Sequence, residues 1–272
     1  MSQKLEIIIL AENNVEKRKL LAEHGLSFYF KYKGQKYLFD TGQGEVLFSN
    51  AEKLGIDLAS IDTVFLSHGH DDHTGGLKKL LQINPEVRVF AHSDIFLPKY
   101  KNTERGLEFI GTELKKSEIN NFEAAETAIT AAAGIYNTGE ISARRETYIN
   151  PRYIVKKEGK EIIDHFNDDT SLYIETESGI VILLGCSHKG VKNIINEIKA
   201  EVGDRKIAAI LGGMHLKRAT SKELEDLIDY FEEINFELLA PMHCTGRVAA
   251  VKFKGAFGDR VRLASVGDRF EF

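Results

Sequence analysis

The sequence has few of the features that mark exported, membrane-bound or polyanion-binding proteins. It contains only two cysteines, Cys186 and Cys244, too few for a disulfide framework. Its 41 acidic residues outnumber 36 basic ones, and the net charge of -5 offers no broad cationic surface for nucleic acid or membranes. The N-terminal apolar run LEIIIL contains Glu6 and is too short for a signal peptide or a membrane span. We therefore expect a cytoplasmic protein that binds neither nucleic acid nor membrane, and the oligomeric state stays open.

The composition is that of a globular protein with a sizeable core. Hydrophobic residues make up 43% and charged residues 28% of the 272 residues, near the average for globular domains. Short β-like runs alternate with amphipathic helical stretches along most of the chain. Between about residues 97 and 150 this pattern weakens into charged helical pieces such as GTELKKSEI and the alanine-rich AAETAITAAAGIY. We therefore predict one domain over residues 1–272, with an insertion or lid at about 97–150.

A dense run of metal-ligand side chains, HGHDDH at residues 68–73, follows a β-branched and aromatic stretch. Crowding so many titratable groups is costly unless a metal ion binds them. Alternation along an extended segment places His68 and His70 on one side, toward one ion, whereas Asp72 and His73 lie further round the turn, toward a second. Two such ions could share a hydroxide, which is a strong nucleophile at neutral pH.

The other histidines fall into two groups. His188, His215 and His243 each come just after a predicted strand. Because residues beyond strand ends converge on one edge of a sheet, we expect them to join the histidines of the HGHDDH run there. Histidines without such a context are more often ordinary core residues, which is the interpretation we give to His24, His92 and His165.

The HGHDDH run, together with LFDTG at residues 38–42, resembles the metallo-β-lactamase superfamily over essentially the whole chain. The resemblance implies an α+β fold, a four-layer αββα sandwich with a metal site at one edge of its two sheets. It also implies one or two divalent ions, usually zinc and sometimes iron or manganese. Carried over by position, it assigns His68 and His70 to the first ion, Asp72 and His73 to the second, His243 as the final ligand histidine, and Asp40 as an acceptor that orients a ligand histidine.

The sequence departs from the superfamily pattern at two ligand positions. Where a ligand histidine is usual, NDDTSL offers only Asp168 or Asp169. Where a bridging aspartate is usual, LLGCSH places Cys186. We expect His188 to take the vacant ligand position. Cys186 is either a thiolate ligand, as in some β-lactamases of the superfamily, or a packed thiol.

His215, in LGGMHL, stands where the tRNA-maturation branch of the superfamily keeps an active-site histidine that is not a ligand. The resemblance therefore implies a proton donor to the leaving group, acting in catalysis together with Asp72. The alternative is a strand-end histidine that only bonds a carbonyl group.

The motifs DDTSL, LLGCSHKG, LGGMHL and PMHCTG resemble one subgroup of the superfamily, named for 7,8-dihydropterin-6-methyl-4-(β-D-ribofuranosyl)aminobenzene-5′-phosphate synthase. This resemblance implies a metal-dependent hydrolase or transferase that acts on a small, anionic, phosphate-bearing molecule. One alternative is a general hydrolase of phosphodiesters, esters or lactones. The other is a redox or interaction protein, by analogy with diiron members of the superfamily that work with a flavin domain.

Overall fold

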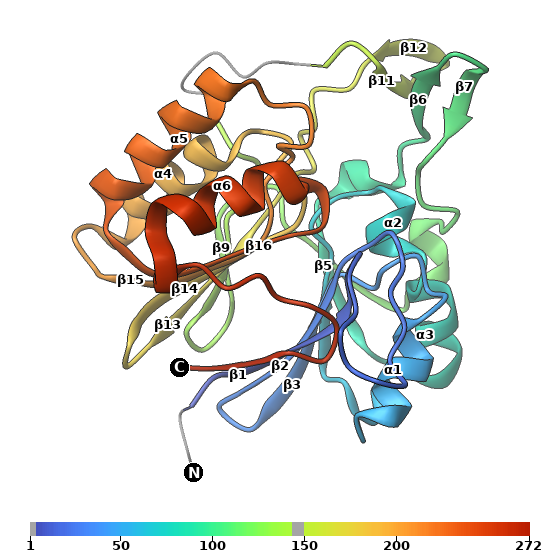
Figure 1. Cartoon of the computed structure of the whole chain (residues 1–272). Coiled ribbons are helices and arrows are strands. Elements are labelled where there is room, and N and C mark those ends of the chain that lie inside the picture. Colours follow the sequence, from blue (N-terminus) through green and yellow to red (C-terminus); the bar gives the residue numbers. More distant parts are fainter. Residues whose placement is uncertain (1–3, 143–149) are drawn as a thin grey trace.

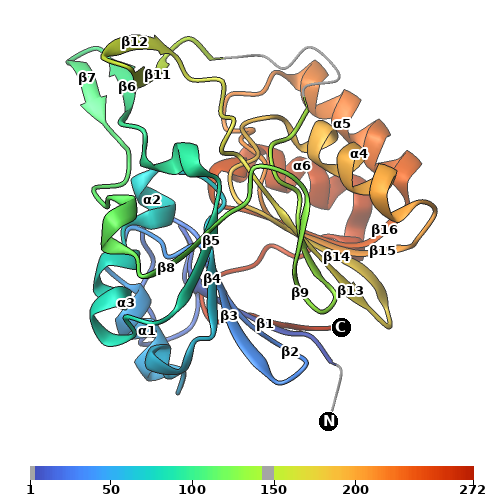
Figure 2. The same ribbon diagram turned by 180° about the vertical axis from the view of Figure 1, so that it is seen from behind.

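The computed structural model describes residues 4–142 and 150–272. Two β-sheets lie face to face, and helices cover the outer face of each (Figure 1). The view from behind shows the same order of layers (Figure 2). The α+β, four-layer αββα sandwich implied by the sequence resemblance is therefore confirmed.

The first sheet has the strand order β17-β1-β2-β3-β4-β5-β8. Its strands alternate their side chains between two environments. In β1, for example, Ile7 and Ile9 face the second sheet, whereas Ile8 and Leu10 face the helices. The strands are β17 (Arg269–Glu271), β1 (Glu6–Ala11), β2 (Ser27–Tyr32), β3 (Gln35–Phe39), β4 (Thr63–Phe65), β5 (Arg88–Ala91) and β8 (Asn121–Ala124), and the helices on this side are α1 (Leu47–Lys53), α2 (Asp71–Thr74) and α3 (Leu77–Ile83).

The second sheet has the order β16-β15-β14-β13-β10-β9. Helix α5 illustrates why its helices form here: Thr220 and Glu223 make a capping box at its start, and its buried Leu224, Leu227 and Phe231 form one face against the sheet. The strands are β16 (Phe236–Met242), β15 (Ile207–Gly213), β14 (Gly179–Leu184), β13 (Leu172–Thr176), β10 (Ile135–Asn137) and β9 (Ile129–Ala132), and the helices are α4 (Val191–Val202), α5 (Ser221–Ile234) and α6 (Arg247–Phe257).

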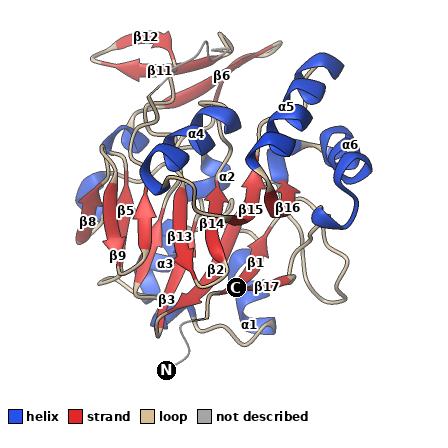
Figure 3. Cartoon of the chain, turned by 90° about the vertical axis from the view of Figure 1, so that its left-hand side faces the viewer, coloured by secondary structure: helices blue, strands red, loops and turns tan. Residues whose placement is uncertain are grey.

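A small third sheet stands beyond the edge at which β15 and β16 end (Figure 3). Its order is β12-β11-β6-β7, with β12 (Lys160–Ile163), β11 (Tyr153–Lys157), β6 (Lys99–Thr103) and β7 (Gly106–Phe109). Within the described ranges, no helix combines the length and the apolar character needed to cross a membrane.

The prediction of helical pieces between residues 97 and 150 is wrong for the part that the structure describes. GTELKKSEI contains only a short 3-10 helix at Lys116–Glu118, and the alanine-rich stretch forms β9 and β10. The small sheet pairs β6 with β11, about fifty residues apart in sequence, and such non-local pairing leaves no local periodicity to read. Residues 143–149 of the predicted insertion lie outside the described residues.

Candidate metal centre

The candidate site lies where parallel strands of both sheets end. In the first sheet β3, β4 and β5 run parallel, and in the second sheet β14, β15 and β16 do. Carboxyl ends of parallel strands meet at one edge, which is where α/β folds place their sites. The residues that follow these ends are Asp40 after β3, His68 after β4, Cys186 and His188 after β14, His215 after β15 and His243 after β16.

Several of these strand ends turn through a left-handed residue that carries a side chain. Asp40 has a φ of 61°, His215 of 51° and His243 of 51°. This conformation is uncommon for residues other than glycine, and such residues gather at functional sites. The turns direct the side chains of Asp40, His215 and His243 into one region.

Three histidines form a first cluster. One nitrogen each from His68, His70 and His188 lie within 4.8 Å of one another, and His68 Nε2 is 3.0 Å from His70 Nδ1. The side chains of all three are buried. Nε2 of His70 and Nε2 of His188 are buried without a hydrogen-bond partner among the described residues. Buried polar atoms are nearly always paired, so the orphaned Nε2 of His188 indicates a ligand that binds between the three rings.

A second cluster lies beside the first. His243 Nε2 is 3.3 Å from His73 Nε2 and 3.3 Å from Asp72 Oδ2, and His73 Nε2 is 3.8 Å from Asp72 Oδ1. His24 Nε2 lies 3.3 Å from Asp72 Oδ2 on the open side. The sequence interpretation of His24 as a core residue is wrong, because its side chain is 60% exposed.

The spacing of both clusters suits one transition-metal ion each. Two ligand atoms bound tetrahedrally to zinc at about 2.0–2.1 Å lie about 3.3 Å apart, close to the 3.0 Å of the first cluster and the 3.3 Å contacts of the second. Nitrogen and carboxylate donors are those that zinc, iron and manganese accept. The residues present therefore fit two metal ions.

Burial sets the protonation of the first cluster. It lowers the pKa of His70 to about 3 and lowers the pKa values of His68 and His188 well below their ordinary value. His73 differs: its burial alone would lower its pKa, but the carboxylates of Asp40 and Asp72 outweigh this and raise it to about 9. The first cluster thus presents neutral imidazoles, the form that binds metal.

Asp40 holds two of the ligand histidines. His73 Nδ1 donates to Asp40 Oδ2 at 2.6 Å, which leaves Nε2 of His73 as the nitrogen that can bind an ion once it has lost its proton. Ser67 Oγ also donates to Asp40 Oδ2, at 2.7 Å, and therefore accepts from His68 Nδ1 at 2.9 Å. The buried Asp40 thus occupies the orienting position that the sequence resemblance gave it.

Asn13 and Glu12, in the segment after β1, hold His243 and were not found from the sequence. His243 Nδ1 donates to Asn13 Oδ1 at 2.9 Å, and the backbone N–H of His243 donates to Glu12 Oε1 at 2.7 Å. Because Nδ1 of His243 donates to Asn13, the lone pair of the neutral His243 ring lies on Nε2. The dipeptide lies outside any metal-binding motif, so only the position after a strand end could have drawn attention to it.

The two cysteines lie between the clusters and His215. Cys186 Sγ is 3.2 Å from His73 Nε2 and groups with His68 and His73, the position that a bridging ligand would take. Burial raises the pKa of the Cys186 thiol. The backbone N–H of His215 donates to Cys244 Sγ at 3.3 Å, and the half-buried His215 ring lies 4.4 Å from that of His188.

The two aspartates of NDDTSL have different surroundings. Asp168 accepts from Lys99 Nζ at 2.9 Å and from the backbone N–H of Gly69 at 2.8 Å, so both its oxygens are engaged and it steadies the HGHDDH loop. Asp169 Oδ2 accepts from the Lys189 N–H at 2.8 Å, whereas its buried Oδ1 has no partner among the described residues. His188, rather than Asp168 or Asp169, is therefore the residue that lies with His68 and His70 in the first cluster.

The small sheet contributes an aromatic wall to the site. The Tyr153 ring lies 5.6 Å from the ring of His70 and 5.5 Å from that of His188. Phe166 stacks on the ring of His188, with the two ring centres 4.0 Å apart. Lys101 Nζ stands 5.8 Å from the centre of the Tyr153 ring, which brings a cation beside this aromatic wall.

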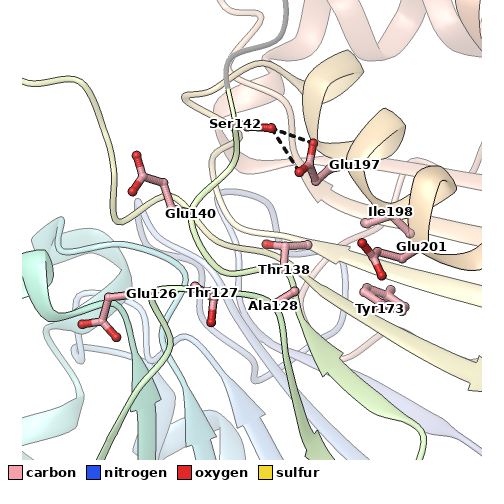
Figure 4. Close-up of a pocket in the computed structure, with 10 residues that line it drawn as sticks. All are labelled: Glu126, Thr127, Ala128, Thr138, Glu140, Ser142, Tyr173, Glu197, Ile198 and Glu201. Carbon is pink, nitrogen blue, oxygen red and sulfur yellow. Dashed lines mark hydrogen bonds between the residues drawn. The ribbon is translucent and has the colours of Figure 1, made fainter.

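A separate pocket lies between the segment before β9, the segment after β10 and helix α4 (Figure 4). Its lining is acidic, and Ser142 donates to the Glu197 carboxylate there. None of the described residues that line it is a histidine or a cysteine, so it does not belong to the metal clusters. The lining residues are Glu126, Thr127, Ala128, Thr138, Glu140, Ser142, Tyr173, Glu197, Ile198 and Glu201.

Known proteins share both this fold and much of this sequence. The chain is 30% identical over 267 residues to 7,8-dihydropterin-6-methyl-4-(β-D-ribofuranosyl)-aminobenzene-5′-phosphate synthase of Methanocaldococcus jannaschii, covering 92% of this chain and 90% of that protein. An uncharacterized protein of the same organism is 33% identical over 258 residues, covering 90% and 93%. The structure of Tm1679, described as a metal-dependent hydrolase of the β-lactamase superfamily, superposes with a TM-score of 0.87 at 29% identity, covering 98% of this chain and 99% of that one. Residues 21–191 match the metallo-β-lactamase superfamily model, and the chain belongs to that superfamily.

Proposed function

We propose that this chain is a dinuclear, metal-dependent enzyme that acts on a small, anionic, phosphate-bearing molecule. The observation that carries the proposal is the pair of adjacent donor clusters, each spaced for one ion. His68, His70 and His188 would hold the first ion, and Asp72, His73 and His243 the second. Bound there, two divalent ions, for which we propose zinc, would supply a hydroxide or an activated substrate group at neutral pH.

The chain's own residues supply the remaining functions. His215 lies beside the first cluster, where its ring can give a proton to a leaving group. The cation of Lys101, beside Tyr153, suits a phosphate group. The net charge of -5 favours a small molecule over nucleic acid or a membrane surface. Both cysteines are free thiols, which suits a cytoplasmic enzyme.

The proposal covers two reaction classes. The relative in M. jannaschii is named as a synthase of a phosphate ester, which supports group transfer to or from a phosphate-bearing aminobenzene riboside. The structure of Tm1679 is described as that of a hydrolase, which supports hydrolysis as the second candidate.

An activity panel on the metal-loaded protein separates these candidates. Pterin intermediates with a ribofuranosylaminobenzene phosphate test group transfer, whereas phosphodiesters and lactones test hydrolysis. We expect turnover of at least one phosphate-bearing compound, and loss of that turnover together with metal in His70→Ala. Full activity after metal removal would contradict the proposal.

A further inference from the structure

His24 lies on the solvent side of the second cluster, on the segment that leads into β2. Its Nε2 is 3.3 Å from Asp72 Oδ2, and its ring centre is 5.0 Å from that of His243. Nitrogen or oxygen atoms of His24, Asp72 and His243 lie within 4.8 Å of one another. His24 is therefore within reach of the same ion as the buried donors.

The backbone fixes His24 at this place. The N–H of Leu26 donates to the carbonyl oxygen of Asp72 at 3.2 Å, and a Cβ at Gly25 would lie only 2.7 Å from that same oxygen. Only glycine permits so close an approach of two main chains. The Gly25 N–H also donates to Asn13 Oδ1 at 3.3 Å, the atom that orients His243. His24 is thus held beside the metal loop by its neighbours.

Three distances within the cluster suit donors around one ion, and His73 Nε2 also lies 3.8 Å from the other Asp72 oxygen, Oδ1. His24 Nε2 and His243 Nε2 are each 3.3 Å from Asp72 Oδ2, and His73 Nε2 is 3.3 Å from His243 Nε2. Ligand atoms of a tetrahedral zinc site are about 3.3 Å apart. We propose that His24 is a fourth protein ligand of the second metal ion, an inference that rests on the dinuclear centre of the proposed function.

This assignment divides the work between the two clusters. Zinc sites with four protein ligands are closed, whereas sites with three keep a position for water or substrate. With His24 bound and Cys186 not a ligand, the second cluster would have no open position. The three histidines of the first cluster would then leave the reactive position at that cluster, near the rings of Tyr153 and His215.

Zinc titration against a competing chelator tests the assignment on wild type, His24→Ala and His165→Ala. His165 is exposed, so its variant controls for the loss of a surface imidazole. We expect wild type and His165→Ala to bind two ions. We expect His24→Ala to bind the first ion normally and the second at least about tenfold more weakly.

A second measurement separates a ligand from a hydrogen-bond donor to Asp72. In the ¹⁵N NMR spectrum of zinc-loaded wild type, Nε2 of a ligand His24 has lost its proton and shows a metal-bound shift. A protonated Nε2, or two ions bound with wild-type affinity by His24→Ala, would overturn the role of His24 alone. Fewer than two ions in wild type would overturn the dinuclear centre itself.

Discussion

Phe166 and His188 lie face to face, with ring centres 4.0 Å apart and planes inclined by 3°. The stack sets the plane of the imidazole whose Nε2 is buried without a partner among the described residues. Phe166 itself is buried and follows the small sheet. The segment after β12 thus shapes the first metal cluster.

We predict that Phe166→Leu weakens the first ion's binding roughly tenfold, the effect of losing a group that orients a ligand. The flexible leucine no longer fixes the ring plane of His188. Chelator competition measures the affinity, and Phe166→Tyr, which keeps the ring, serves as the control. Equal affinities for all three proteins would show that the stack does not position His188.

Asp40→Asn should weaken metal binding by tenfold to a hundredfold without abolishing it. The amide carries no charge and cannot accept from both Ser67 and His73 as the carboxylate does. The measurement is the same competition titration. An unchanged affinity would place Asp40 outside the metal centre.

Lys99→Met should lower the free energy of unfolding by about 3–5 kcal/mol, because it leaves buried carboxylates without their cation. Lys99 Nζ is 2.7 Å from Asp164 Oδ2 and 2.9 Å from Asp168 Oδ1, and all three side chains are at most 5% exposed. Urea denaturation measures the loss. Lys156→Met, which removes an exposed cation from the same small sheet, should change stability little, and equal losses would contradict the interpretation.

Asp169 should make stability fall as the pH rises. Burial raises its pKa from 3.8 to about 7, so the neutral carboxyl stabilises the fold at low pH. This contribution is lost as the pH rises through the folded pKa. Between about pH 5 and pH 8, urea denaturation of the metal-free protein should show a steeper loss for wild type than for Asp169→Asn. Parallel curves would mean that Asp169 is ionised throughout.

The sequence predicted the fold and the edge that carries the site because both depend on local patterns. Strand runs followed at once by histidines identify strand ends, and HGHDDH with LFDTG identifies the superfamily. What it did not predict depends on contacts between distant segments. His24 lies beside the second cluster because Leu26 and Asp72 pair through their main chains, Asn13 reaches it through His243, and Lys99 of the small sheet meets Asp168. Such contacts leave no hydrophobic periodicity and no motif spacing in the sequence.

The histidines outside the motif show the same limit. His92 is buried, as expected, and its Nδ1 accepts from the Asp94 N–H at 3.1 Å. His165 is exposed, so its interpretation as a core residue is wrong. A single histidine outside a motif gives no pattern from which burial can be read.

The metal content of His188→Ala and His215→Ala tests the central claim most directly. If His188 completes the first cluster, its loss should remove one ion per chain, because only two of the three cluster histidines, His68 and His70, then remain to hold that ion. His215→Ala should keep two ions and lower kcat by about 10²-fold to 10⁴-fold, as expected for loss of a general acid. Metal lost from the His215 variant and retained in the His188 variant would contradict the account.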